Sequence, residues 1–153
     1  MKIWVDADAC PGPIKELIIR AAIRLRIQAI FVANKYIGVP DSVYVSAVRV
    51  GMGPEVVDAY VAQHAEASDF AITQDIPLAS VLVPKGVVVI NPRGELYTED
   101  NVRERLSIRD FMHDIREAGV VTSGPSQFGQ KEKQRFAATF DRELTKAMRR
   151  KDE

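Results

Sequence analysis

Apolar residues along this chain gather in short β-branched runs that alternate with stretches of helical spacing. Five such runs predict strands, at residues 2–6, 27–33, 43–50, 69–73 and 87–91. Helical patterns lie between them, near residues 13–25, 54–66 and 76–83. Strands that alternate with helices are typical of a parallel sheet, and the run Val87 to Ile90, apolar throughout, suits a strand covered on both faces. We therefore predict an α/β three-layer sandwich with a mainly parallel central sheet.

The C-terminal part of the chain reads as helical. After the turn cluster Asn91 to Gly94, a helix is predicted from about 99 to 118, then a linker through residues 122–129 and a last helix over about 131–149. Apolar positions recur in that last helix at helical spacing: Phe136, Phe140, Leu144 and Ala147. One of its faces therefore packs on something, either its own domain or a second subunit of a homo-oligomer.

Length and composition indicate one ordinary globular domain. With 153 residues, 46% of them apolar and 27% charged, the chain suits a single domain, 1–153, and not a disordered segment. We expect a core over about 1–118 and a C-terminal linker and helix over about 119–153.

The charges balance globally but not locally. Lysine plus arginine equals aspartate plus glutamate at 21 each, so no overall field favours nucleic acid or a membrane. Residues 131–153, however, carry eight basic and five acidic groups. Any nucleic-acid contact would therefore be local.

Cysteine and histidine are too few for several classes of site. One cysteine and two histidines exclude a disulfide framework and cysteine-rich zinc sites. Cys10 is expected to be a packed small residue and not a nucleophile. No signal-peptide pattern or membrane-length apolar run is seen, so we expect a cytoplasmic protein with no membrane partner.

Acidic residues follow the first predicted strand directly. Asp6 and Asp8 come just before the break at Cys10 to Pro13, and in an extended segment residues two apart point the same way. Such close like charges resist joint ionisation unless a cation lies between them. The alternative for Asp8 is a cap for the helix near residue 13.

Further acidic residues are predicted near the same edge of the sheet. Glu55 and Asp58 open the second helix, and Asp75 comes just after the strand at 69–73. Ligands of parallel α/β sheets bind beyond the carboxyl ends of the strands, where Asp6 and Asp75 would meet. Glu55 could simply favour the helix dipole, and Asp75 could cap the next helix.

A site made of carboxylates favours hard cations. Asp6, Asp8, Asp58 and Asp75 together suit Mg²⁺ or Mn²⁺, which commonly handle phosphates by activating water. Glu55, Asn34 and Thr73 are candidate supporting groups. For Asn34 and Thr73, loop or packing roles are the alternative.

The motifs resemble those of a known family. The carboxylate spacing is similar to that of PIN-domain and flap-endonuclease cores. More narrowly, the chain resembles the bacterial YaiI/YqxD family, which is PIN-like. The motifs that carry this resemblance are Asp6-Ala-Asp-Ala-Cys-Pro11, Asp69-x-x-Ile-Thr-x-Asp-Ile-Pro-Leu-Ala79, Lys85-Gly86, Asn91-x-Arg-Gly94, Gly124-Pro125, Phe136 and Asp141.

The PIN-like resemblance implies a metal-dependent nuclease. On it, Asp6, Asp58 and Asp75 fall at metal-binding and catalytic positions, with Asp8 as an addition, while Glu55 stands where an aspartate is expected. RNA is favoured over DNA as the substrate by the same analogy. The candidates for phosphate contacts are Lys131, Lys133, Arg135 and Arg93. A solvated helix face is the alternative for this basic segment.

Two other functions fit part of the pattern. Asp-x-Asp after an apolar strand also resembles haloacid-dehalogenase-like phosphatases, in which the first aspartate is a covalent nucleophile. A metal- or nucleic-acid-binding module without catalysis would keep the same acidic pocket.

Overall fold

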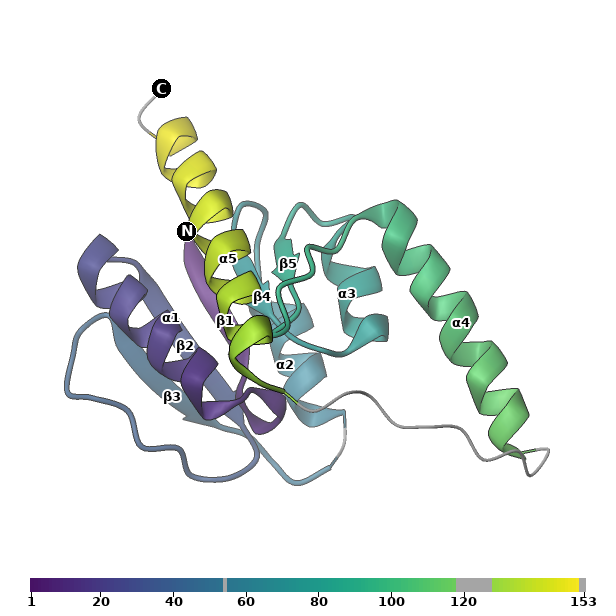
Figure 1. Cartoon of the computed structure of the whole chain (residues 1–153). Coiled ribbons are helices and arrows are strands. Elements are labelled where there is room, and N and C mark those ends of the chain that lie inside the picture. The colour runs from purple at the N-terminus through teal and green to yellow at the C-terminus, as the bar shows by residue number, and fades with distance from the viewer. Residues whose placement is uncertain (54, 118–127, 152–153) are drawn as a thin grey trace.

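The chain folds into a parallel sheet with helices on both faces (Figure 1). The computed structural model describes residues 1–53, 55–117 and 128–151, and only the backbone of residues 109–117. Its strands are β1 Lys2–Asp6, β2 Gln28–Ala33, β3 Val45–Arg49, β4 Phe70–Ile72 and β5 Val88–Ile90. Its helices are the short 3-10 helix η1 Ala7–Ala9, α1 Gly12–Leu25, α2 Val56–His64, α3 Ile76–Leu82, α4 Glu99–Glu117 and α5 Gln130–Lys151.

The strand order creates a reversal point in the middle of the sheet. The order is β3-β2-β1-β4-β5, and every pair is parallel. The chain moves outward from β1 to β3 and then returns to place β4 on the other side of β1. In open α/β sheets such a reversal opens a crevice beyond the carboxyl ends of the two central strands. Here that crevice lies beyond Asp6 and Ile72.

Side chains of each strand alternate between two apolar layers. Ile3 and Val5 pack with the buried residues of α1 and α5, while Trp4 packs with those of α2 and α3. Figure 1 shows α1 and α5 together over one face of the sheet. The predicted three-layer α/β sandwich is therefore confirmed.

The last helix packs on its own sheet. Phe136, Phe140 and Leu144 are buried against the β-strands and α1. The Phe136 and Phe140 rings stack with centroids 5.1 Å apart, and Phe140 meets Phe70 edge-on at 6.3 Å. Of the two partners expected for this helix, its own domain is the one that the structure gives to its apolar face.

Gly94 sets how closely α5 approaches the loop after β5. The Thr139 hydroxyl donates a 2.7 Å hydrogen bond to the Gly94 carbonyl. A Cβ at Gly94 would lie 2.5 Å from Cγ of Arg135 and 2.7 Å from the Phe136 nitrogen, and its φ is +99°. Only glycine fits both the contact and the backbone.

Asp69 joins β1 and β4 at their amino ends. It is 6% exposed and accepts hydrogen bonds from the Lys2 amide, the Trp4 indole and the Glu66 amide at 2.9, 3.0 and 2.9 Å. The sequence correctly places Asp69 at the edge opposite Asp6. We expected Asp69 to be a turn residue, and one of its three donors, the Glu66 amide, does lie in the turn before it. The other two donors come from β1.

The predicted elements agree with the observed ones to within about two residues. The predicted end of α4 at residue 118 and residues 122–127 of the predicted linker lie outside the described residues, as does residue 54. Among the described helices, none combines the length and apolar character that crossing a membrane requires.

Replacing Asp69 by asparagine should destabilise the fold. The amide group of asparagine would turn a donor toward at least one of the three N–H groups and leave it buried without an acceptor. We expect a loss of about 3 kcal/mol in the free energy of unfolding, measured by urea denaturation. The exposed Asp41→Asn is the control, and equal stability of both variants would contradict the role given to Asp69.

Gly94→Ala should loosen the docking of α5. The added methyl group clashes with the α5 backbone and strains a positive φ, so we expect a loss of about 3 kcal/mol in unfolding free energy. Gly38→Ala is the matched control, because a Cβ there meets nothing within 4 Å. If both alanine variants have the unfolding free energy of the wild type, Gly94 does not limit how closely α5 packs.

Candidate active site

Thr73 links the two central strands at their carboxyl ends. It follows β4, is 1% exposed, and donates a 3.0 Å hydrogen bond from its hydroxyl to Oδ2 of Asp6, the last residue of β1. The same hydroxyl oxygen accepts the Asp75 backbone amide at 3.0 Å. Thr73 thus fixes the distance between Asp6 and the turn that carries Asp75. This is a positioning role for a residue that the sequence named as a candidate support.

Asp75 caps α3. Its Oδ1 accepts a 2.7 Å hydrogen bond from the Leu78 amide, as expected from the sequence. Its side chain lines the same cavity as Asp58 in α2, and its charge helps to raise the pKa of Asp58. The cap holds the Asp75 carboxyl at the β4–α3 turn, where the reversal of strand order opens the sheet.

Asp8 does not cap α1. That helix starts at Gly12 with Pro11 at the capping position and has no side-chain cap. Asp8 lies in η1, and its Oδ2 accepts the Asn34 backbone amide at 2.9 Å. Asn34 comes just after β2, so this bond ties the ends of β1 and β2 together. Asn34 acts through its backbone here.

Glu55 and Asp58 line a cavity together with Asp75. The cavity, of about 450 Å³, lies between α2 and α3. Glu55 stands at the N-terminal end of α2 and makes no side-chain cap. Its charge contributes to the raised pKa of Asp58, so it faces the same acidic group.

Burial and neighbouring charges make ionisation costly at this site. Burial, the hydrogen bond with Asp75 and the charges of Asp75, Asp6 and Glu55 raise the pKa of Asp58 from 3.8 to about 7. Burial also raises the pKa of Asp6; the Thr73 hydrogen bond opposes this, and the charges of Asp75 and Asp8 add to it. Asp58 therefore keeps its proton to a pH much closer to neutral than an ordinary aspartate does.

The carboxylates are neighbours, yet each is engaged with a protein group. Among the described residues, no three acidic, histidine or cysteine side chains surround one point so as to hold a metal ion. Asp6 is bonded to the Thr73 hydroxyl, Asp8 to the Asn34 amide and Asp75 to the Leu78 amide, and Asp58 lines a cavity beside Asp75. The sequence correctly grouped these residues at one edge. It could not predict that they bond to the protein in this arrangement.

Two cavities share residues of the turn that carries Asp75. One, of about 330 Å³, is lined by Asp6, Ala9, Gln74, Asp75 and Ile76. The other, of about 350 Å³, shares Gln74 and Ile76 and is otherwise polar. The remaining residues that line the second cavity are Asn91, Arg93, Glu95, Tyr97, Arg105, Glu132 and Arg135.

The basic residues predicted for nucleic acid separate into two groups. Arg93 and Arg135 line the second cavity, with Arg105, which sequence reasoning missed. Arg105 forms an ion pair with Glu95, which lies ten residues earlier in the chain. That spacing is too long for a helical repeat to reveal the pair. Lys131 is exposed and Lys133 half-buried in the first turns of α5, and neither lines the cavity.

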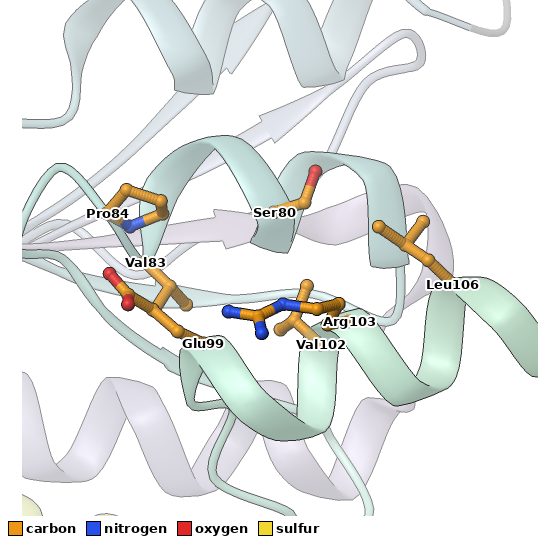
Figure 2. A pocket seen from close by; sticks show the side chains of 7 residues that line it. All are labelled: Ser80, Val83, Pro84, Glu99, Val102, Arg103 and Leu106. Atoms are coloured by element: carbon orange, nitrogen blue, oxygen red, sulfur yellow. The ribbon is translucent and has the colours of Figure 1, made fainter.

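A further cavity of about 310 Å³ lies between α3 and α4 and lacks these groups (Figure 2). Its lining is aliphatic apart from Ser80, Glu99 and Arg103, and the Ser80 hydroxyl already donates to the Pro77 carbonyl at 2.6 Å. Cys10 is also inert, because burial raises the pKa of its thiol to about 12. Neither feature gathers several acidic groups as the edge beyond β1 and β4 does.

Asp58 should make the stability of the protein depend on pH. Between its ordinary pKa of 3.8 and about 7, folded Asp58 holds a proton that the unfolded chain releases, so its stabilising contribution is lost as pH rises through this range. Asp58→Asn presents a permanent donor to Asp75. The unfolding free energy of Asp58→Asn minus that of the wild type should therefore increase with pH between about 4 and 7. Urea denaturation in a buffer that contains a metal chelator measures this difference. Asp100→Asn, an exposed control, should show no such trend, and a flat difference for Asp58→Asn would refute the raised pKa.

Comparison with known proteins places the chain in a family. The protein-family model described as "Uncharacterized BCR, YaiI/YqxD family" matches residues 4–146. The chain is 75% identical over 146 residues to a UPF0178 protein of Syntrophobacter fumaroxidans, an alignment covering 95% of each chain. It is 54% identical over 149 residues to a UPF0178 protein of Myxococcus xanthus, with 97% of each covered. No solved structure matches. The chain therefore belongs to the YaiI/YqxD family, as its motifs indicated.

Proposed function

We propose that this protein hydrolyses phosphodiester bonds of nucleic acid at the crevice beyond β1 and β4, with Mg²⁺ or Mn²⁺ held by Asp6, Asp58 and Asp75. The observation that carries the proposal is the gathering of three carboxyl groups from separate elements at the reversal of strand order. Carboxyl groups assembled against their mutual repulsion are typical of functional sites.

The donor set fits a hard divalent cation in chemistry, and the side chains would have to turn toward a common point, which no three of them share among the described residues. The set consists of carboxylate oxygens, the ligands that Mg²⁺ and Mn²⁺ prefer. Near neutral pH, Asp58 still carries a proton in part of the molecules, because burial and the neighbouring Asp75 raise its pKa to about 7. A cation would release that proton and make both oxygens available, and it would offset the repulsion that raises the pKa of Asp6. Bound there, it would supply an activated water and neutralise charge that builds on the phosphate.

The chain's own residues supply positioning. Thr73 orients Asp6 through its hydroxyl, and the Leu78 amide orients Asp75 through Oδ1. The Asn34 amide fixes Asp8 beside them, so that Asp8 adds negative charge next to Asp6. Groups locked in this way lose little freedom when a substrate binds.

The likeness of the sequence to PIN-domain nucleases supports the same reaction, with RNA favoured as substrate. Lys131 and Lys133, in the first turns of α5, are suited to phosphate contacts outside the cavities. Such contacts would position a strand by charge and not by base identity.

Asp6→Asn and Asp75→Asn should abolish both metal binding and cleavage. Asparagine keeps one oxygen and still caps α3 at position 75, so the fold should survive while a ligand charge is lost. We expect Mn²⁺ affinity to fall in calorimetry and cleavage of single-stranded RNA and DNA to fall at least about 100-fold. Asp100→Asn, exposed in the first turn of α4, should behave as wild type.

The outcomes separate the competing functions. Mn²⁺ binding or strand binding without cleavage by wild type would indicate a non-catalytic module. A phosphate covalently bound to Asp6 after incubation with a phosphomonoester would indicate a phosphatase of the haloacid-dehalogenase type. No Mn²⁺ binding at all would overturn the shared carboxylate site.

A further inference from the structure

A polar cavity beside the acidic site is built by four separate parts of the chain. The β4–α3 turn gives Gln74 and Ile76, the loop after β5 gives Asn91 to Tyr97, α4 gives Arg105, and α5 gives Glu132 and Arg135. Its volume of about 350 Å³ is within the range of small-ligand sites, roughly 300–1,000 Å³. The motif Asn91 to Gly94, which the hydrolytic site leaves unused, forms one of its walls.

Three arginines face two glutamates in this cavity. Arg105 donates to both carboxylate oxygens of Glu95, so that pair is satisfied internally. Arg93 lies 3.9 Å from Glu132 and 6.0 Å from the Phe128 ring centroid. For Arg135, by contrast, no carboxylate lies within ion-pair distance among the described residues. The lining thus keeps one excess positive charge.

Glu132 is held by the start of α5. Its Oε2 accepts the Gly129 amide at 3.0 Å, the back-bond of a helix cap. Backbone amides, together with Arg93 and Arg135, hold the pKa of Glu132 below its usual range, so it stays charged. Glu132 makes its hydrogen bond with this amide and its ion pair with Arg93, whereas Arg135 acts on it only through its charge. The N–H groups of Arg135 therefore remain available to an outside anion.

The position of Arg135 is fixed by packing. Its Cγ lies where a Cβ on Gly94 would come within 2.5 Å, and Phe136 next to it is fully buried. Tyr97 borders the cavity, and its hydroxyl oxygen accepts the Asn91 amide at 2.9 Å, which leaves the hydroxyl proton for another acceptor. An anion would meet positioned donors, as strong arginine–phosphate pairing requires.

We infer that this cavity binds a phosphate of a nucleic-acid strand whose scissile phosphodiester lies in the neighbouring acidic cavity. Gln74 and Ile76 line both cavities, one on each side of Asp75, so a strand could bridge the two across that turn. Identifying the anion as a strand phosphate rests on the proposed function. The arginines contact the backbone, so the site reads no base sequence.

The test is strand binding without turnover. Fluorescein-labelled single-stranded RNA and DNA of equal length are titrated in EDTA over a range of salt, with wild type, Arg135→Gln and Arg142→Gln. Arg142 is the matched control, since it lies on the same helix, is 56% exposed and pairs with Glu143. We expect Arg135→Gln to weaken binding about tenfold for either strand and to reduce the salt slope by about 0.7, the value for one lost contact. Arg142→Gln should bind as wild type.

Arg135→Lys guards against a structural explanation. It keeps the charge and should restore the salt slope but only part of the affinity, because lysine cannot form a bidentate contact. Equal effects of Arg135→Gln and Arg142→Gln, or no binding by wild type, would overturn the inference. Cleavage is read separately with Mn²⁺. A protein that binds through Arg135 but does not cleave fails the proposed function alone, and one that cleaves while Arg135→Gln binds normally fails this inference alone.

Discussion

The pairing of β1 with β4 is the constraint on which the rest of the structure depends. These two strands meet where the order of the sheet reverses, and a carboxylate secures them at each end. Asp69 holds the amino ends through the Lys2 amide and the Trp4 indole, and Asp6 holds the carboxyl ends through Thr73. Because each bond is buried or half-buried, misplacing either strand would leave a polar group without a partner.

The carboxyl groups at the two ends of this strand pair lie in different electrostatic surroundings. Asp69 accepts three hydrogen bonds, so it holds the amino ends of the two strands together. At the other end Asp6 and Asp58 have raised pKa values because burial and neighbouring carboxylates oppose their ionisation. That end is less stable than it could be, which is the common condition of sites kept for chemistry.

The last helix, α5, covers one face of the sheet and brings a basic residue to its acidic edge. It buries Phe136 and Phe140 against α1 and the strands, and its contact with Gly94 brings Arg135 beside the acidic crevice. An acidic cavity and a cavity with excess positive charge thus share residues of the same turn. If the acidic cavity holds a divalent cation, as we propose, both cavities would attract the phosphates of one strand.

The periodic pattern of apolar residues was enough to predict the secondary structure and the layers of this protein from its sequence alone. Alternating apolar runs gave the strands and the three layers, and the rule for parallel strands placed Asp6 and Asp75 at one edge. The apolar stripe of α5 predicted a buried face, although it could not say which surface covers it. Partners distant in sequence were decided only by the tertiary structure. Examples are the Asn34 amide on Asp8, the Trp4 indole on Asp69 and the meeting of Arg105 with Arg135. These contacts depend on how separate elements pack, and no repeat within one element encodes that packing.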